Sequence, residues 1–153
     1  MSIQEYAERM KPVGVLYVDV YPYRVLPDRS VEFLMLKRRS DVVMPSRWQA
    51  VSGKLRAKET IHSAFVRQVE KKTGHRVEVA PLSQVNVFYD AHYDTVMMVP
   101  AAGAELGEDP ISIDESLHVA HKWSRIEEAK GHLPWPTPQA SLEEIALRVA
   151  GGG

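Results

Sequence analysis

The chain has 153 residues, of which 44% are hydrophobic and 25% charged, a composition typical of a single globular domain. Its 19 Lys and Arg residues nearly balance 20 Asp and Glu residues, and the net charge of -1 gives no overall field of the kind that attracts nucleic-acid duplexes or membrane surfaces. The absence of Cys excludes disulfides, thiolate metal sites and a Cys nucleophile, and the six His residues lack the H-E-x-x-H spacing of a zincin.

Neither end of the sequence predicts a membrane segment or a cleaved signal. No apolar stretch approaches the ~20 residues that cross a bilayer. Residues 1–12, MSIQEYAERMKP, contain acidic side chains and no apolar run, so we expect no secretory signal and a cytoplasmic location. We expect one domain over residues 1–150 and a flexible glycine tail over residues 151–153.

Two strands are predicted near the start of the chain. Residues 13–20 are dense in β-branched side chains and predict a buried strand, and residues 31–37 predict a second one. The segment between them contains Pro22, Pro27 and Asp28, which favour a turn over residues 21–30. Strand, turn and strand at this spacing predict an antiparallel pair.

A short strand at residues 48–51 runs into Gly53, and a helix is predicted over residues 61–72. Thr60 is a suitable N-cap, and Gly74 stands where helices commonly end in a left-handed residue. Apolar residues recur at every fourth position and predict the buried side of this helix: Ile61, Phe65 and Val69.

The next part of the chain predicts a hairpin, a loop and a strand. Residues 76–89 and 93–99 have the composition of two arms joined by turn residues 90–92. Residues 100–114, rich in Ala, Gly and acids, predict a surface loop, and residues 118–123 predict a further strand.

The last elements are predicted to be helical. Residues 125–130 favour a short helix, and residues 133–138, which contain three prolines, predict an extended segment. Ser141 and Glu144 have the spacing of a capping box, which predicts a final helix of about three turns. Strands interleaved with two or three helices favour an α+β or α/β layered fold.

Gly53, Glu59, Arg67 and Gly74 have the spacing of a known motif. In the segment GKLRAKETIHSAFVRQVEKKTG, the sequence resembles the Nudix superfamily, whose box reads G-x5-E-x7-R-E-U-x-E-E-x-G-U with U aliphatic. Trp48 upstream and the order of the strands agree with this. The resemblance implies an α+β fold, an α/β/α sandwich with a mixed central β-sheet. It is closest to small bacterial pyrophosphohydrolases of nucleoside triphosphates or dihydroneopterin triphosphate.

The chain departs from the box at the three glutamates that bind divalent metal ions in the family. Those positions hold Gln68, Lys71 and Lys72, and the spacing i, i+3, i+4 places them on one helix face. A metal ion at this face would be repelled by the two lysines, because each pair of unit charges contributes roughly 4 kcal/mol at about 4 Å and an effective dielectric near 20. Ammonium groups cannot ligate a cation, so we expect neither Mg²⁺ nor another cofactor. His75 also replaces the last aliphatic residue of the box.

The residues that match the box, Gly53, Glu59, Arg67 and Gly74, are expected to keep the shape of the site. The resemblance implies a salt bridge between the Glu59 and Arg67 side chains and tight turns at the two glycines. A further glutamate of the family falls near Leu117, with Glu115 close by in the sequence.

Two interpretations stay open for the basic residues Arg39, Lys71 and Lys72. They bind ligand phosphates, or they are solvated cations at a strand end and a helix end. The tryptophans allow a similar choice between core or lid residues and platforms for a base: Trp48, Trp123 and Trp135.

Three functions stay open, and with them the question of whether the chain is an enzyme. The preferred one is a degenerate domain that binds a nucleotide or another phosphoanhydride ligand, with magnesium-dependent hydrolysis impaired or absent. The second is an active pyrophosphohydrolase of nucleoside diphosphate- or triphosphate-linked substrates, whose Mg²⁺ ligands have moved to other acids: Glu59, Glu70, Glu115, Asp90 and Asp94. The third is an interaction domain with an empty cleft. The resemblance also makes a homodimer an expectation.

Overall fold

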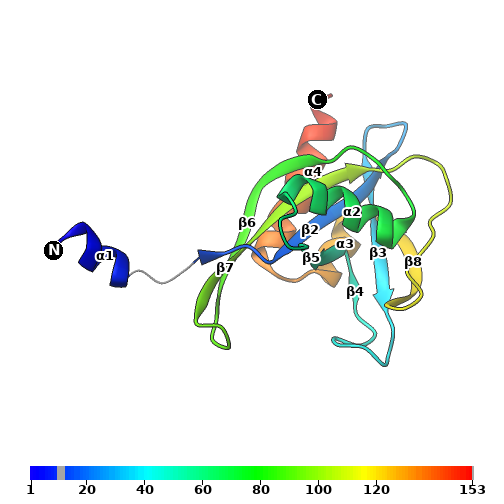
Figure 1. Ribbon diagram of the computed structural model, residues 1–153. Helices are drawn as coiled ribbons and strands as arrows, with labels where there is room; N and C mark the ends of the chain where they lie inside the picture. The colour runs from blue at the N-terminus through cyan, green and yellow to red at the C-terminus, as the bar shows by residue number, and fades with distance from the viewer. Residues whose placement is uncertain (10–12, 153) are drawn as a thin grey trace.

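In the part of the chain that the structure describes, eight strands form one mixed sheet with helices on both of its faces (Figure 1). The computed structural model describes residues 1–9 and 13–152. Its elements in chain order are α1 (Ile3–Arg9), β1 (Val13–Gly14), β2 (Tyr17–Val25), β3 (Val31–Arg38), β4 (Trp48–Gln49), β5 (Val51–Lys54), α2 (Ile61–Thr73), β6 (Ala80–Asp90), β7 (Thr95–Glu105), β8 (His118–Ser124), α3 (Ile126–His132) and α4 (Pro136–Ala150). The predicted α+β fold with a mixed central sheet is confirmed.

Strand β2 lies at the centre of the sheet because it pairs with three other strands. It runs parallel to β7, with Asp19 opposite Ala101, and antiparallel to β5 over residues 17–20 and to β3 over residues 23–25. Pro22 lies where β2 changes its antiparallel partner from β5 to β3, so a residue without an N–H group is tolerated inside a central strand. On the two sides, β7 also pairs with β6 and β1, and β3 also pairs with β8 and β4.

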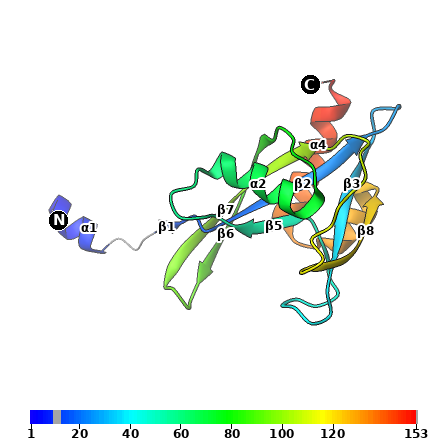
Figure 2. The ribbon, with the colours of Figure 1, turned by 45° about the vertical axis from the view of Figure 1, so that its right-hand side comes forward.

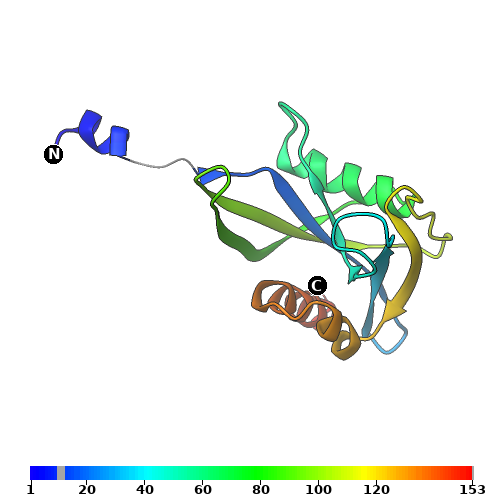
Figure 3. The ribbon, with the colours of Figure 1, turned by 90° about the horizontal axis from the view of Figure 1, so that it is seen from below.

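Alternating side chains divide the core between the two faces of the sheet. Along β3, Leu34 and Leu36 belong to the cluster beneath α2, whereas Phe33 and Met35 belong to the cluster beneath α3 and α4. Figure 3 shows α2 on one side of the sheet and α3 and α4 on the other. Burial of each such side chain is worth about 1.5–3 kcal/mol, so both helical layers are held by the same strand.

The buried strand predicted over residues 13–20 is wrong in its first part, because Val13 and Gly14 form the short, partly exposed β1 and β2 begins only at Tyr17. The turn predicted over residues 21–30 is wrong at its beginning, because β2 continues to Val25 and the chain turns only over residues 26–30. Pro22 is fully buried. Burial in the central strand therefore outweighs the turn preference of this proline. The antiparallel pairing of the first two long strands is confirmed.

Helix α2 confirms the predicted helix and both of its ends. Phe65 and Val69 are buried, as the four-residue spacing indicates. Ile61 is wrong as a core residue, because its side chain is 38% exposed and the buried residues of α2 begin only at Ala64.

The surface loop predicted over residues 100–114 is wrong in its first part, because β7 continues to Glu105. Ala101, Ala102 and Ala104 are buried in this stretch. Alanine has little intrinsic preference for strands, so packing between the two helical layers determines the structure here. The predicted hairpin is confirmed, although its first arm begins at Ala80 rather than at residue 76 and its turn lies over residues 91–94 rather than 90–92.

The extended segment predicted over residues 133–138 is right only as far as Trp135, because α4 begins at Pro136. Pro136 and Pro138 lie in the first helical turn, where a missing N–H group costs no hydrogen bond. The strand β8 and the short helix α3 are confirmed.

The capping box predicted at Ser141 and Glu144 is wrong. Ser141 is buried inside α4. Glu144 accepts a hydrogen bond from the backbone N–H of Ser83 at 2.9 Å instead, which joins α4 to β6. The spacing is right for a cap, but α4 has already begun one turn earlier.

The two ends of the chain differ in their contacts. Helix α1 has no counterpart among the predicted elements, has no buried residue, and stands away from the sheet (Figures 1 and 2). At the other end, the N–H groups of Gly151 and Gly152 donate to carbonyl groups of α4 at 3.0 Å each. Gly153, the last residue of the predicted tail, lies outside the described residues. Within residues 1–9 and 13–152, no helix is long and apolar enough to cross a membrane.

Candidate functional site

Helix α2 and the loops before and after it form one unit over residues 53–74. The N-terminus of α2 is capped by Thr60, whose hydroxyl accepts a hydrogen bond from the N–H of Ser63 at 3.1 Å. Its C-terminus is Gly74, which has a φ of 78°. A Cβ atom at Gly74 would lie 2.9 Å from the Cβ of Ser112, so both the left-handed conformation and the close approach require glycine.

Glu59 and Arg67 form the salt bridge that the resemblance implies. Arg67 Nε lies 2.7 Å from Glu59 Oε2, and Arg67 Nη2 lies 2.8 Å from Glu59 Oε1. The N–H of Arg56 donates to the same carboxylate at 2.9 Å. The Arg67 guanidinium, followed by this N–H, lowers the pKa of Glu59 from 4.5 to about 2. Arg67 also donates to the carbonyl of Lys54 at 2.9 Å, so the pair ties the loop to both β5 and α2.

Gln68 lies directly over Gly53. The Gln68 side chain is 4% exposed, and its Nε2 donates to the carbonyl oxygen of Lys54 at 3.0 Å. A Cβ atom at Gly53 would lie 2.2 Å from Gln68 Cδ, so the amide occupies the space that the glycine leaves open. Gln68 Oε1 is buried without a hydrogen-bond partner among the described residues.

Lys72 is buried one turn further along the same helix face. It is 5% exposed, and its ammonium group donates to the carbonyl oxygen of Ser52. Burial, followed by the neighbouring charge of Lys71, lowers the pKa of Lys72 from 10.5 to about 8, and Asp114 opposes this shift. Lys71 is exposed. The two carbonyl groups at Ser52 and Lys54 are thus engaged by donors from α2.

Three residues from outside the box surround this turn of α2. Sequence reasoning noted Arg38 only as part of the basic end of a strand, and it assigned none of the three to the site. Arg38 and Asp114 act electrostatically on Lys72 and on His118, which is 1% exposed. Burial, then Lys72 and Arg38, lower the pKa of His118 to about 4, so its ring is neutral near pH 7. The side-chain amide of Gln49 donates to His118 Nε2 at 3.0 Å. These residues are far apart in sequence, and no local pattern joins them.

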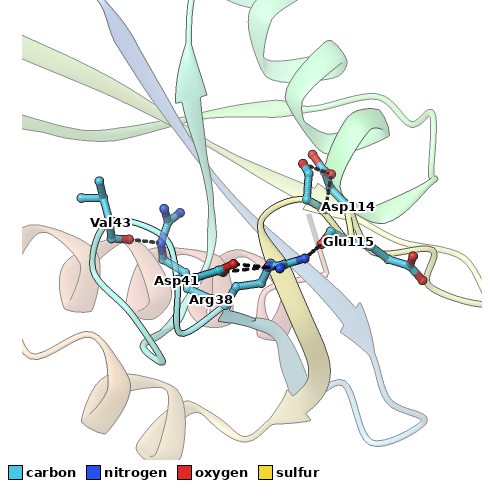
Figure 4. Close-up of polar contacts among 7 residues, drawn as sticks. Arg38, Asp41, Val43, Asp114 and Glu115 are labelled. Atoms are coloured by element: carbon cyan, nitrogen blue, oxygen red, sulfur yellow. Dashed lines mark hydrogen bonds and ion pairs between the residues drawn. The ribbon is translucent and has the colours of Figure 1, made fainter.

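Arg39 lies in the neighbouring loops with its guanidinium already bonded. It donates to both carboxylate oxygens of Asp41, at 2.8 and 2.9 Å, and to the carbonyl of Glu115 at 3.0 Å. Figure 4 shows Asp41 in the loop after β3 and Glu115 in the loop before β8, the two residues that these contacts join. Arg38, drawn beside them, donates from Nε to the carbonyl of Val43 at 2.6 Å. Arg39 therefore links two loops, while the charge of Arg38 acts on Lys72.

The acids that would hold a relocated metal ion are not brought together. Glu59 is bonded to Arg67, Glu70 lies 3.6 Å from an exposed Arg76, and Glu115 is on the loop before β8. Within the described residues, no group of three or more His, Asp or Glu side chains is placed to hold a metal ion. At the turn of Gln68 and Lys72 the amide Nε2 and the ammonium group are donors, and Gln68 Oε1 is the one side-chain oxygen of this pair, whereas a divalent ion prefers several oxygen ligands.

The acidic residues at the turn between β6 and β7 accept hydrogen bonds that stabilise the turn. Asp90 Oδ1 accepts the N–H groups of His92 and Tyr93 at 2.9 and 3.2 Å. The hydroxyl of Tyr89 donates to Asp94 at 2.8 Å. These bonds are those of a turn, in agreement with the hairpin interpretation of these acids.

A cavity of about 450 Å³ lies on the α3 and α4 side of the sheet, beside Ser52. The sheet contributes polar side chains to it: Asp19, Tyr21, Gln49, Ser52 and Asn86. The loop after β3, the segment between α3 and α4, and the start of α4 contribute apolar ones: Met44, Leu133, Trp135, Pro136 and Pro138. Two larger hollows, of about 620 and 730 Å³, are lined by neither Lys72 nor Ser52.

Asp19 carries the only charge among the described residues that line this cavity. Burial raises its pKa from 3.8 to about 6, and a hydrogen bond with Ser52 and the charge of Lys72 oppose this. Sequence reasoning missed Asp19. The available signal was a single carboxylate inside the β-branched run of residues 13–20. Ser52 lies between the two parts of the site, because its carbonyl binds Lys72 and its side chain binds Asp19.

A family model for the NUDIX domain matches residues 20–145 of the chain. No curated protein matches it. Many solved structures have the same fold, and three of them are as follows. The E. coli dihydroneopterin triphosphate pyrophosphohydrolase is 22% identical with a TM-score of 0.69, covering 90% of this chain and 97% of that one. The C. elegans Ap4A hydrolase in a binary complex is 16% identical with a TM-score of 0.68, covering 88% and 97%. The NUDIX domain of Shewanella oneidensis NrtR, solved with ADP ribose, is 18% identical with a TM-score of 0.62, covering 97% of each chain.

Proposed function

The chain belongs to the Nudix superfamily, and from this premise we propose that it binds a nucleotide or another phosphoanhydride ligand with its own cationic side chains, magnesium-dependent hydrolysis being impaired or absent. The observation that carries the proposal is the contact of Lys72 with Ser52, next to that of Gln68 with Lys54. Both contacts place N–H donors where the box of the superfamily has carboxylates.

The charges around this turn support an anionic ligand. Lys71 is exposed beside the buried Lys72, and Arg38 adds a third positive charge. Asp114 is a nearby acid, and it is already bonded to Ser116 through its own side chain at 2.6 Å. A phosphate oxygen accepts hydrogen bonds from ammonium groups, and charge-assisted bonds of this kind are about twice as strong as neutral ones.

The structural neighbours support the ligand class. One was solved with ADP ribose, and another is a pyrophosphohydrolase of dihydroneopterin triphosphate. Both compounds contain phosphoanhydride bonds. A compound with a ring at one end and phosphates at the other would suit a cavity that adjoins a cationic turn.

The test is the binding of pyrophosphate by titration calorimetry, in EDTA and again with Mg²⁺. We expect binding in EDTA, and a loss of about tenfold or more in Lys71→Gln, since one charge-assisted contact is worth roughly 1.5–3 kcal/mol. Lys58→Gln is the matched control, because Lys58 is an exposed lysine in the loop before α2. Binding that requires Mg²⁺ would contradict the proposal.

Hydrolysis assays and co-purification with the same protein samples distinguish the two other functions, an active hydrolase and an interaction domain. Metal-dependent hydrolysis of nucleoside triphosphates that is abolished by Glu59→Gln or Glu70→Gln would indicate an active enzyme with relocated ligands. No binding of any phosphate compound, together with a co-purifying protein, would indicate an interaction domain.

A further inference from the structure

The cavity beside Ser52 has two chemically different walls. Trp135, 43% exposed, and the two prolines that follow at the start of α4 are apolar. The opposite wall is the sheet, where Asp19 and Asn86 are polar. A volume of about 450 Å³ lies in the range of small-molecule sites, roughly 300–1,000 Å³. A flat ring fits such a cavity, because it can stack on an indole and present its polar edge to the sheet.

Asp19 determines which edge the ring must present. Its carboxylate is half-buried in the cavity wall and bonded to Ser52, and its pKa of about 6 leaves it ionised at pH 7.5. An ionised carboxylate only accepts hydrogen bonds, and its two oxygens match two parallel N–H donors. The burial that raises the pKa of Asp19 also makes each missing donor costly.

We propose that Asp19 is a specificity-determining residue that selects rings with two adjacent N–H donors on one edge, as guanine and pterins have. Adenine places an acceptor nitrogen beside its amino group, and uracil places carbonyl groups on both sides of its N–H. Either edge would set a lone pair against the Asp19 carboxylate. This inference extends the proposed function from the phosphates to the ring of the ligand.

The positions of the cationic turn and of the cavity support a ligand with its phosphates at the turn and its ring in the cavity. Ser52 contacts Lys72 through its carbonyl and Asp19 through its side chain, so the cationic turn and the cavity are adjacent. Neither Lys71 nor Lys72 lines the cavity, so a ligand with phosphates at these lysines would have to extend past Ser52 for its ring to enter the cavity. Asn86 and Thr137 add polar groups to the cavity lining.

The test uses nucleosides, which have no phosphate. Calorimetry at pH 7.5 is expected to give guanosine an affinity roughly tenfold to a hundredfold higher than adenosine, the usual value of hydrogen bonds to a charged group. Asp19→Asn is expected to remove this preference, and Glu127→Gln, an exposed carboxylate on α3, is expected to keep it. Equal binding of the two nucleosides, or an unchanged preference in Asp19→Asn, overturns the inference.

A second measurement needs no variant. 1-Methylguanosine lacks one of the two donors, and the wild-type chain is expected to bind it at least tenfold more weakly than guanosine. Equal affinity would overturn the inference even if Asp19→Asn does not fold. The pyrophosphate titration tests the phosphate site separately from the guanosine titration. If guanosine binds through Asp19 and pyrophosphate does not bind, the proposed phosphate site is contradicted and the inference on Asp19 stands.

Discussion

The ammonium group of Lys72 donates a hydrogen bond to the carbonyl oxygen of Ser52, so a positive charge of the helix is bonded directly to the strand that it covers. Gln68 makes the equivalent contact with Lys54 one turn earlier. These two bonds connect α2 to β5 without an ion between them. Their energetic consequences can be measured separately from any ligand.

Lys72→Met is expected to stabilise the protein at pH 7 by roughly 1–2 kcal/mol. The drop in pKa from 10.5 to about 8 corresponds to about 3 kcal/mol of cost for the buried charge, partly offset by the bond to Ser52. The unfolded chain binds this proton more tightly than the folded chain, so wild-type stability contributed by Lys72 rises between pH 8 and 10.5. Urea unfolding at pH 7 and pH 9.5 measures this. A difference between variant and wild type that stays constant with pH would contradict it.

Glu59→Gln is expected to lower the stability of the protein at neutral pH. The pKa of Glu59 falls from 4.5 to about 2 in the folded state, so the contribution is complete above pH 4.5 and is lost as the pH falls toward 2. Unfolding midpoints of wild type and variant should therefore converge in acid. Glu70→Gln is the matched control, since Glu70 has a 3.6 Å contact with an exposed arginine and should change the midpoint little.

Restoring three carboxylates is expected to create an affinity for divalent ions. The triple variant Gln68→Glu, Lys71→Glu, Lys72→Glu turns the donor face of α2 into an acceptor face. We expect Mn²⁺, followed by electron paramagnetic resonance, to bind it roughly tenfold or more tightly than the wild type. The double variant Lys71→Gln, Lys72→Gln removes the positive charges without adding ligands. Equal Mn²⁺ affinity in the triple and double variants would show that the carboxylates do not assemble a site.

Gly53→Ala is expected to destabilise the protein by about 1–3 kcal/mol, because the new methyl group would lie 2.2 Å from Gln68 Cδ. Combining it with Gln68→Ala frees that space, so the double variant should lose less than the sum of the two changes. Gly107→Ala is the control, since a Cβ atom there meets nothing within 4 Å. Additive effects in the double-mutant cycle would mean that Gly53 is needed for another reason.

The sequence predicts local structure well where neighbouring residues decide it. The cap at Thr60, the left-handed Gly74 and the hairpin between β6 and β7 follow from short patterns. The end of β7 and the start of α4 do not, because the alanines after Val99 and the prolines after Trp135 take their structure from tertiary packing. The single domain, the cytoplasmic location and the homodimer stay predictions.

Some residues of the candidate site can likewise be predicted from local sequence, and others cannot. The box gives the positions of Gln68 and Lys72 because α2 has a regular geometry. Asp19 and His118 come from strands remote in the sequence, and only the sheet brings them close to the box. A shift of register between Lys37 and Arg38 also occurs where β3 pairs with β8. A pattern of alternating residues cannot foresee that irregularity, and therefore cannot tell which of two consecutive arginines acts on the site.

The positive charge that is bonded to Ser52 belongs to the side chain of Lys72 and is therefore a permanent part of the protein. A magnesium ion must be acquired from the surroundings and can be withdrawn by a chelator, whereas an ammonium group is synthesised with the chain and stays attached to it. An anion held at this turn by the lysines would therefore need no magnesium ion for its binding, and a chelator that removes magnesium would not release it.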